Sequence, residues 1–398
     1  MKYPLLKDAD LQGKRVLLRA GFDVPMENGK VMDASRIEAL VPTMLHILAN
    51  GASLILLSHQ GRPDGKPDPA FSQKPLVEHL SKSLKTDVKF CPSCVGPEAL
   101  KAAESLKPGE VLLLENLRFD PREKKNDPAF AKELAALGDI YVNDAFTNCH
   151  RAHASMVELP SLLPGFIGLQ LEEELQHLSP VMDDPKRPLT LVLGGAKMET
   201  KIPVLRQFLG KGDTILLGGA IANTFLAARG FDVAASKYEQ EQVENAQELM
   251  LESEKPGYAS IQVPRDAVVA TEAVEKASKL DLPVENVVGD MRILDIGKVT
   301  IERYIAAIKE SKTIVWNGPV GYYELNTFSH ASKRIAEAIA EATKAGAISI
   351  VGGGDTIDFH TRYGYDLGTY TFVSTGGGAM LEFLSGNPLP ALAALARG

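Results

Sequence analysis

Short runs rich in Val, Ile and Leu alternate with longer amphipathic segments along the first third of the chain. Residues 36–49 and 75–84 repeat their apolar positions at helical spacing. Periodicity alone does not separate strand from helix in the short runs, but their length and the turn residues after them favour strands. The strand-like runs are residues 15–19, 53–57, 111–114 and 140–142. This alternation predicts βαβ units in a parallel sheet.

The same alternation returns in the second half, after a predicted amphipathic helix at residues 169–178 and a boundary with two prolines at 183–188. Here each predicted strand ends in glycine. The clearest case is residues 348–356, an apolar run followed by three glycines, an acid and a hydroxyl. The glycine-rich strand ends lie at residues 193–197, 217–220, 316–321, 352–356 and 374–379. In a parallel sheet these turns share the carboxyl edge, where ligands bind.

Five glycine-rich turns that each precede a helix would form a floor of backbone N–H groups, which suits phosphate. A plain tight turn with a helix N-cap is the alternative for any one of them, and close packing of helix on strand explains others, Gly218 and Gly219 above all. Lys197 and Lys201, four apart at the predicted start of a helix, would face the same way and reach a transferred group. Asp355 supplies a carboxylate that suits Mg²⁺ beside phosphates.

Cationic side chains, rather than glycines, follow the predicted strands of the first half. They are Arg36, His59, Arg62, Arg118, His150, Arg151 and His153. Any one of them alone would be interpreted as a solvated surface group. Four successive strand ends with Arg or His in an acidic chain, however, predict a cationic binding site for a small polyanion, which we call the basket. The planar fork of arginine binds phosphate and carboxylate bidentately.

Length and composition limit the folds and functions that these patterns can indicate. The 398 residues predict two domains, and 45% apolar residues are enough for two cores. A net charge of −8 argues against nucleic-acid or membrane partners. The N-terminal residues lack a signal-peptide pattern and no apolar run is long enough to span a membrane, so we expect a cytoplasmic protein. Three cysteines suit a reducing compartment, and Cys91 and Cys94 have redox or half-zinc spacing without a second pair.

A cationic basket in one domain and a glycine floor with Lys197 and Asp355 in the other predict phosphoryl transfer between a small anionic metabolite and a nucleotide across an interdomain cleft. No general base is needed if the acceptor is a carboxylate, which is ionised at pH 7. The P-loop and dinucleotide-binding fingerprints are absent. A dehydrogenase that uses the glycine turns for NAD is nevertheless the alternative from a different class.

Eight motifs together resemble phosphoglycerate kinase, and they occur in that family's order over nearly the whole chain. They are residues 15–19 with Pro25, 58–63, 115–119, 143–146 with 150–155, 193–197, 316–324, 352–356 and 374–378. No single motif is specific, but the set is. The resemblance implies an α/β fold of two doubly wound, Rossmann-like parallel-sheet domains, each a three-layer αβα arrangement, joined by a hinge helix.

The resemblance also implies a domain organisation and a reaction. Residues 1–170 would bind 3-phosphoglycerate, 171–186 would form the interdomain helix and linker, 187–384 would bind the nucleotide, and 385–398 would return to the first domain. The implied enzyme is a hinge-bending monomer and a phosphotransferase with a carboxyl acceptor. It would transfer a phosphoryl group reversibly from 1,3-bisphosphoglycerate to ADP, with Mg²⁺, giving 3-phosphoglycerate and ATP in glycolysis or gluconeogenesis.

Carried over position by position, the resemblance implies three sets of site residues. The substrate set is Gly21, Phe22, Asp23, Arg36, His59, Gln60, Gly61, Arg62, Arg118 and Arg151. The nucleotide set is Lys197, Lys201, Gly219, Asn317, Pro319, Glu324, Gly353, Gly354, Asp355 and Thr356, with Asp355 as the Mg²⁺ ligand. The set that would act on the transferring phosphoryl group is Arg36, Lys197, Gly353, Gly376 and Gly377.

The chain departs from the family pattern in two loops. The family usually has an acid where this chain has Gly21, and here an acid stands at Asp23 instead. In an extended loop these two positions point to one side, so Asp23 is expected to replace the lost contact to the substrate hydroxyl. Residues 147–149 read Thr-Asn-Cys in place of Gly-Thr/Ser-Ala, which would stiffen the loop, and Gln60 replaces a leucine. A family member that binds ligands but is catalytically weakened is therefore the alternative.

Overall fold

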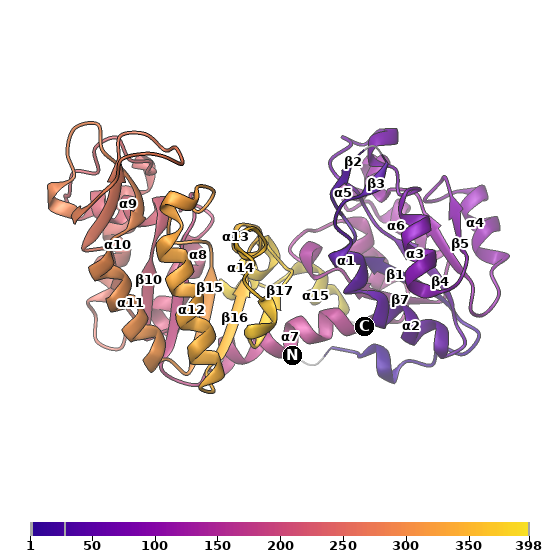
Figure 1. Cartoon of the computed structure of the whole chain (residues 1–398). Coiled ribbons are helices and arrows are strands. Elements are labelled where there is room, and N and C mark those ends of the chain that lie inside the picture. Colours follow the sequence, from indigo (N-terminus) through magenta and orange to yellow (C-terminus); the bar gives the residue numbers. More distant parts are fainter. Residues whose placement is uncertain (1–2, 28, 397–398) are drawn as a thin grey trace. The chain divides into compact units, whose positions relative to one another are not determined.

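The computed structural model describes residues 3–27 and 29–396 and divides the chain into two compact units, each considered by itself below (Figure 1). Unit 1 comprises residues 1–176 and 388–398, and unit 2 comprises residues 177–387. The boundary lies within helix α7 (Leu169–Asp183). Each unit contains a six-stranded parallel sheet with helices on both faces, so the α/β fold with doubly wound parallel sheets is confirmed.

The sheet of unit 1 has the strand order β5-β6-β4-β1-β7-β8. Its strands are β1 (Arg15–Ala20), β4 (Ser53–Leu57), β5 (Val88–Cys91), β6 (Val111–Leu114), β7 (Ile140–Asp144) and β8 (Gly165–Ile167), beside a small hairpin of β2 (Met26–Glu27) and β3 (Lys30–Val31). Its helices are α1 (Ser35–Glu38), α2 (Val41–Ala49), α3 (Leu76–Leu84), α4 (Pro97–Glu104), α5 (Pro121–Lys124), α6 (Pro128–Ala135) and α15 (Pro390–Leu395). Every residue of β4 is buried, as expected for a central strand covered on both faces.

Two buried polar side chains fix the start of α7. Leu171 N donates to Asp144 Oδ1 at 2.8 Å, and Leu169 N donates to Thr43 Oγ1 at 3.0 Å, so orphan amides of the first turn are satisfied. Burial raises the pKa of Asp144 to about 7. The beginning of α7 is thus tied to the carboxyl end of β7.

Residues 388–396 complete unit 1. Helix α15 places Ala391, Leu392 and Leu395 in buried positions, and Ala391 N donates to Cys149 O at 3.2 Å. This segment follows unit 2 in the chain, so unit 1 is built from two separate stretches of sequence.

The parallel sheet of unit 2 has the order β11-β10-β9-β15-β16-β17. Its strands are β9 (Leu189–Leu193), β10 (Thr214–Leu217), β11 (Ser260–Gln262), β15 (Thr313–Asn317), β16 (Ile348–Gly352) and β17 (Phe372–Ser374). Its helices are α8 (Ile202–Lys211), α9 (Gly219–Ala228), α10 (Val243–Ser253), α11 (Lys298–Glu310), α12 (His330–Lys344), α13 (Gly354–Tyr363) and α14 (Gly378–Leu384). Numbered along the chain, this is the 3-2-1-4-5-6 order, whose switch point falls between β9 and β15.

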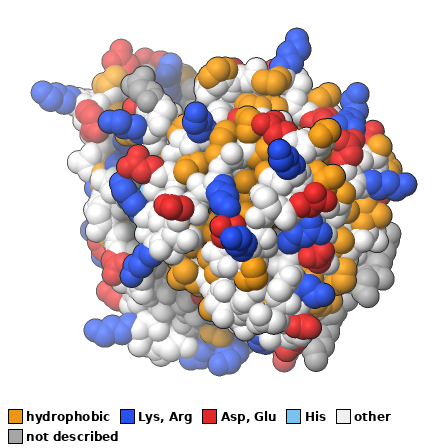
Figure 2. Space-filling view, turned by 90° about the vertical axis from the view of Figure 1, so that its right-hand side faces the viewer, with side chains coloured by type: hydrophobic (Ala, Val, Ile, Leu, Met, Phe, Trp, Pro, Cys, Tyr) orange, Lys and Arg blue, Asp and Glu red, His pale blue; other side chains and the backbone are white. Residues whose placement is uncertain are grey.

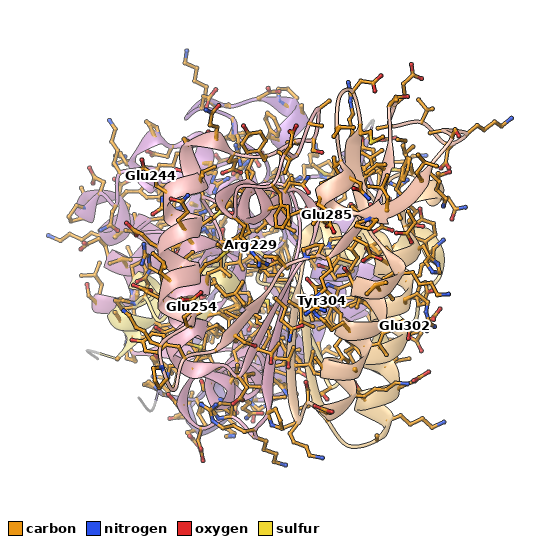
Figure 3. The ribbon with its side chains drawn as sticks, turned by 90° about the vertical axis from the view of Figure 1, so that its left-hand side faces the viewer. Arg229, Glu244, Glu254, Glu285, Glu302 and Tyr304 are labelled. Atoms are coloured by element: carbon orange, nitrogen blue, oxygen red, sulfur yellow. The ribbon has the colours of Figure 1, made fainter. Side chains whose placement is uncertain are left out.

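The core of unit 2 contains the chain's only tryptophan. Trp316 on β15 is fully buried, and its ring approaches Phe359 at 6.0 Å and His360 at 5.3 Å between centroids. Tyr304 of α11 points inward and its hydroxyl donates to Leu217 O, whereas Glu244 lies on the outer side of α10 (Figure 3). The helices therefore cover the sheet with their apolar faces.

Several elements were not anticipated from the sequence. They are β5, β8, β11 and a three-stranded antiparallel sheet of β12 (Asp266–Ala270), β13 (Leu280–Pro283) and β14 (Arg292–Ile296). The helix predicted at residues 36–49 is divided into α1 and α2, because Pro42 belongs to the first turn of a new helix.

On the face shown in Figure 2, acidic and basic side chains are interspersed, so that face has no extended patch of one sign. Within residues 3–27 and 29–396, none of the helices is both long enough and apolar enough to span a bilayer.

Candidate active site

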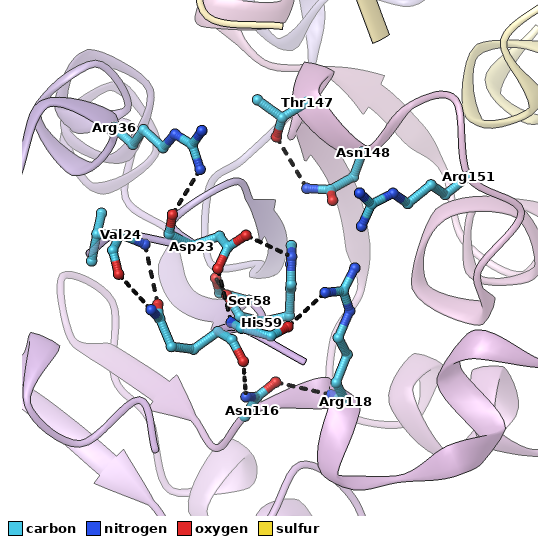
Figure 4. Close-up of polar contacts among 12 residues, drawn as sticks. Asp23, Val24, Arg36, Ser58, His59, Asn116, Arg118, Thr147, Asn148 and Arg151 are labelled. Atoms are coloured by element: carbon cyan, nitrogen blue, oxygen red, sulfur yellow. Dashed lines mark hydrogen bonds and ion pairs between the residues drawn. The ribbon is translucent and has the colours of Figure 1, made fainter. Parts of the chain in front are cut away.

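Loops at the carboxyl edge of the unit 1 sheet bring the cationic side chains together around Asp23. In Figure 4 the side chains of Arg36, Arg118 and Arg151 approach Asp23 and His59 from different sides. Asp23 Oδ1 accepts from Gly61 N at 2.8 Å, and Arg36 donates to the Asp23 carbonyl oxygen at 2.7 Å. The basket that the sequence predicts therefore encloses the Asp23 carboxylate.

Asp23 is ionised in this setting. Burial alone would raise the pKa of its carboxyl group, but the facing His59 ring, the Gly61 N–H and the Arg36 charge outweigh burial and hold the pKa well below its usual range. The side chain is 38% exposed, so it retains room to accept a hydrogen bond from a ligand.

His59 lies in the wall of the basket and is almost completely buried. Its Nε2 is 3.5 Å from Asp23 Oδ2, and its Nδ1 is 3.1 Å from an Arg19 nitrogen. Burial and the positive charges of Arg19 and Arg118 lower the pKa of His59 to about 3, although the Asp23 carboxylate opposes this shift. The imidazole is therefore neutral at physiological pH.

Two arginines of the basket, Arg118 and Arg151, repel one another. Arg118 donates to Gly61 O at 2.7 Å, and burial together with the charges of Arg151 and Arg19 lowers its pKa to about 10. Burial also lowers the pKa of Arg151. Arg36 and Arg62 are exposed. A bound anion would relieve the repulsion between these cations.

Three buried nitrogen atoms in the basket lack hydrogen-bond partners among the described residues. They are His59 Nε2, Arg118 Nε and His153 Nδ1. Burial lowers the pKa of His153 to about 3, so both histidines are neutral and each can donate one ring N–H. Because buried donors in a native protein are normally paired, their concentration at one place indicates a ligand site.

Three predicted substrate residues contribute through the backbone or by positioning. The Phe22 ring is fully buried in the core, so its side chain shapes the loop and does not reach a ligand. Both polar atoms of the Gln60 side-chain amide contact the backbone of Val24, where they hold the loop after β1. A Cβ at Gly21 would lie 3.1 Å from Thr147 Oγ1, so the Thr147 side chain stands beside the position where the family has an acid.

The glycine turns of unit 2 form the floor of a cavity of about 330 Å³ at the carboxyl ends of β9, β15 and β16. The predicted residues that line it are Lys197, Lys201, Asn317, Gly353, Gly354, Asp355, Thr356 and Gly377. Gly376 is buried and is not among the lining residues. Gly353 has φ +101°, and a Cβ there would lie 2.9 Å from Asn317 Nδ2, so the turn excludes side chains.

Lys201 is the only described lysine whose pKa falls to about 8, because burial outweighs the attraction of Asp355. Its Nζ donates to Asn317 Oδ1, and Asn317 Nδ2 donates to Gly352 O at 3.0 Å. The ammonium group is thus held at the cavity wall with few competing partners, where it can meet a phosphate.

A second cavity of about 390 Å³ adjoins the first and shares Gly195, Ala196 and Asp355 with it. Gly219, Pro319 and Glu324, which belong to the predicted nucleotide set, line this cavity. A Cβ at Gly219 would lie 2.8 Å from Gly195 O, so close backbone packing explains this glycine, as expected. Together the two cavities have the size and character needed for a base, a ribose and phosphates.

The lysines that were expected on one helix are not helical. Helix α8 starts only at Ile202, so Lys197 and Lys201 lie in the turn before it, and the predicted i, i+4 spacing on a helix is wrong. Pro203 occupies the first turn and favours a helix start at this point. Both lysines nevertheless line the same cavity.

Asp355 is the carboxylate of the unit 2 site that could hold Mg²⁺. Among the residues that the structure describes, no group of three or more His, Cys, Asp or Glu side chains is arranged to hold a metal ion. Asp355 is exposed at the junction of the two cavities. One carboxylate fits a Mg²⁺ ion that is carried mainly by nucleotide phosphates and water.

Sequence reasoning missed the polar residues behind the basket. Arg19, Glu123 and Ser155 are fully buried and connected to one another by hydrogen bonds. The one available signal was an arginine within the apolar strand β1, because an arginine is almost never fully buried unless it is paired. In unit 2, Asn223 and Arg292 line the larger cavity without having been expected there.

Proteins similar to this chain are known. The family model for phosphoglycerate kinase matches residues 6–387. Phosphoglycerate kinase of Chloroflexus aurantiacus (strain ATCC 29366 / DSM 635 / J-10-fl) is 46% identical over 398 residues, covering 99% of each protein.

Solved structures agree with this similarity. The phosphoglycerate kinase structure from Coxiella burnetii aligns with a TM-score of 0.91 and 36% identity, covering 100% of this chain and 99% of that one. The phosphoglycerate kinase structure from Pyrococcus horikoshii OT3 aligns with a TM-score of 0.84 and 32% identity, covering 99% of this chain and 98% of that one.

Proposed function

This chain belongs to the phosphoglycerate kinase family, and from that premise we propose that it transfers a phosphoryl group reversibly from 1,3-bisphosphoglycerate to ADP, giving 3-phosphoglycerate and ATP with Mg²⁺ in glycolysis or gluconeogenesis. As a family member it is a phosphotransferase with a carboxyl acceptor. The observation that carries the proposal is the group of buried nitrogen donors in unit 1 that have no hydrogen-bond partner among the described residues and lie around the ionised Asp23 carboxylate.

This arrangement matches the chemistry of 3-phosphoglycerate, which has two anionic ends and a hydroxyl group between them. Arg62, Arg118 and Arg151 supply the positive charge for the anionic groups. His59 supplies a neutral N–H donor, and Asp23 accepts a hydrogen bond from the hydroxyl. The substrate set from Gly21 to Arg151 therefore acts through four cationic side chains, one histidine and one carboxylate, with Gly21, Phe22, Gln60 and Gly61 shaping the loops.

In the direction of ATP consumption, a carboxylate oxygen of 3-phosphoglycerate bonds to the γ-phosphorus while the bond from that phosphorus to the bridging oxygen breaks. No proton moves, so no general base is required. Arg36, Lys197 and the amides of Gly353 and Gly377 would stabilise the transferring phosphoryl group by hydrogen bonds and charge, whereas the Gly376 amide already donates to Ser374 Oγ at 3.1 Å and would hold the turn. Lys201 would hold the nucleotide phosphates.

We propose Asp355 as the single protein ligand of the Mg²⁺ that accompanies the nucleotide. When bound, Mg²⁺ neutralises phosphate charge and orients the phosphates for in-line transfer. Thr356 is buried, and its hydroxyl accepts from Gly318 N at 2.8 Å and donates to Gly352 O at 3.0 Å. These bonds hold the turn that presents Asp355.

The test is ATP-dependent turnover of 3-phosphoglycerate with Mg²⁺, followed through a coupled dehydrogenase that consumes NADH. Wild-type protein should turn over and Lys197→Ala should lose most activity. ATP binding without turnover would instead favour the catalytically weakened alternative. Binding of NAD without binding of ATP would contradict the family reaction and favour a dehydrogenase.

A second experiment tests the role of Asp23. Asp23→Ala should raise KM for 3-phosphoglycerate by about 10- to 100-fold, because one charged hydrogen bond contributes about 1.5–3 kcal/mol. KM for ATP should change little. An unchanged KM for 3-phosphoglycerate would show that Asp23 does not bind the substrate hydroxyl.

We further propose that the protein works as a monomer in the cytoplasm. Cys91, Cys94 and Cys149 are buried free thiols, which suits a reducing compartment. Light scattering coupled to size exclusion should give a mass near 42.9 kDa. A mass twice as large would contradict the monomer.

A further inference from the structure

A chain of buried hydrogen bonds leads to the back of His59 from the far side of the substrate basket. Glu123 Oε1 accepts from Ser155 Oγ at 2.6 Å, and Glu123 Oε2 accepts from Ser155 N at 3.0 Å. Ser155 Oγ in turn accepts from Arg19 Nε at 3.0 Å. The three side chains are at most 1% exposed. We call Glu123, Ser155 and Arg19 the buried hydrogen-bond chain.

The buried hydrogen-bond chain determines which ring nitrogen of His59 carries the hydrogen atom. Arg19 is 3.1 Å from His59 Nδ1 and has only donors, so Nδ1 must accept. The hydrogen of the neutral imidazole then lies on Nε2. Nε2 is buried, has no hydrogen-bond partner among the described residues, and lies 3.5 Å from Asp23 Oδ2 on the substrate side.

We propose that the buried hydrogen-bond chain fixes His59 as the neutral tautomer with hydrogen on Nε2, and so makes it a permanent donor to the carboxylate or hydroxyl of the bound acceptor. Glu123, Ser155 and Arg19 are positioning residues that act through His59. The identity of the acceptor rests on the proposed function, whereas the tautomer is a property of the unliganded protein.

The direction of the hydrogen bonds makes the state of His59 independent of pH over the working range. A proton can bind only at Nδ1, and that position already faces a guanidinium group. The ionisable groups around the ring are Arg19 from β1, Asp23 from the loop after β1, Arg118 from the segment after β6, Glu123 from α5 and His153 from the loop before residues 154–158. The Asp23 carboxylate favours protonation of His59, and burial together with the charges of Arg19 and Arg118 outweighs it.

A contribution to folding stability does not by itself explain why the buried hydrogen-bond chain contains two charged residues. Two buried charges of opposite sign are often no more stable than apolar residues of similar volume, because both charges lose hydration. Here burial lowers the pKa of Arg19 and raises that of Glu123, so the surroundings oppose both charges. A role in orienting a ligand-binding side chain gives a reason for keeping them.

The decisive measurement is the ¹⁵N spectrum of the imidazole nitrogens in the unliganded full chain labelled with ¹⁵N-histidine. His59→Gln identifies the His59 signals among the eight histidines. Wild-type protein should show hydrogen on Nε2 and no His59 titration between pH 5 and 8. Hydrogen on Nδ1, or titration of His59 within that range, would overturn the proposal. This result needs no substitution in the buried hydrogen-bond chain.

Ser155→Ala then tests the origin of the tautomer, because it separates Arg19 from Glu123 without removing a charge. In this variant we expect a mixture of tautomers, His59 titration above pH 5, and a KM for 3-phosphoglycerate that rises several-fold and depends on pH, with a smaller change in kcat. Ser53→Ala, another buried serine of unit 1 outside the chain, is the matched control and should leave the spectrum unchanged. A wild-type His59 spectrum in Ser155→Ala would overturn the role of the chain.

Glu123→Gln provides a second variant if Ser155→Ala does not fold. Its amide oxygen can still accept from Ser155, so the geometry should persist while the counter-charge of Arg19 is lost. We expect the Nε2 tautomer to remain the main form. If the wild-type tautomer is found but 3-phosphoglycerate is not turned over, the proposed function fails and the tautomer assignment stands.

Discussion

Replacing Lys201 with methionine should stabilise unit 2 at neutral pH and weaken nucleotide binding. Burial lowers the pKa of Lys201 from 10.5 to about 8. At about 1.4 kcal/mol for each tenfold change in proton affinity, holding the ammonium group in the native state at pH 7 costs about 3 kcal/mol. Lys201→Met removes this cost but leaves Asn317 Oδ1 without its donor, which offsets about 1–3 kcal/mol at every pH.

The dependence of stability on pH separates the cost of the buried Lys201 charge from the cost of the lost hydrogen bond to Asn317. Between pH 8 and 10.5 the unfolded chain holds more protons at Lys201 than the native state does, so wild-type stability from this group rises with pH. The cost is fully present below pH 8. The advantage of Lys201→Met over wild type should therefore shrink by about 2.5 kcal/mol between pH 7 and pH 10.

Urea unfolding followed by fluorescence measures this difference in the relevant unit, because the only tryptophan, Trp316, is buried in unit 2. Lys197→Met removes an exposed lysine from the same cavity and is the matched control. Its stability difference from wild type should be similar at the two pH values. If Lys201→Met differs from wild type equally at pH 7 and pH 10, the reasoning about its buried charge is refuted.

Nucleotide affinity should show the opposite consequence of the same charge. As the pH rises above 8, wild-type protein loses the Lys201 ammonium group and its Kd for ATP should increase by up to about tenfold per pH unit. Lys201→Met should bind ATP more weakly at pH 7 and should lack this additional dependence on pH. Isothermal titration in buffers of equal ionic strength tests both statements.

Three further outcomes follow from contacts described by the structure. Gly21→Asp alone should reduce turnover, because its Cβ would lie 3.1 Å from Thr147 Oγ1. The double variant Gly21→Asp with Thr147→Gly should recover turnover. Equal activity of the single and double variants would contradict this steric argument. Asp266→Asn should lower unfolding free energy by about 1–2 kcal/mol in the urea assay, since Asp266 accepts from two amides and one hydroxyl at the start of α11, and an unchanged midpoint would refute this. Arg15→Ala should cost under about 1 kcal/mol by circular dichroism, because its ion pair with Asp139 is partly exposed; a larger loss would mean the pair is more than a surface contact.

The sequence predicted the parallel sheets well because their strands are buried on both faces. The run at residues 53–57 corresponds to β4, and 111–114 corresponds to β6. Such runs are continuous in Val, Ile and Leu and are followed by polar turn residues. The antiparallel strand β13 (Leu280–Pro283) contains an exposed acid and ends in proline, so its pattern resembles a loop.

The site was predicted less completely, because several of its contacts join residues far apart in the chain. The hydrogen bond from Arg19 to Ser155 spans 136 positions, and no local pattern indicates it. Likewise the space beside Gly21 is filled by Thr147, which lies on a different loop. Residue types at strand ends indicated which side chains gather at the edge, but the hydrogen bonds among them depend on the packed fold.

The return of residues 388–396 to unit 1 has a consequence for the order of folding during synthesis. Unit 2 is one continuous stretch, so all of its strands are synthesised before α15. Unit 1 lacks the Ala391 N donor to Cys149 O until then. We therefore expect unit 1, although its first strand is synthesised earliest, to complete its packing only after α15 has been made.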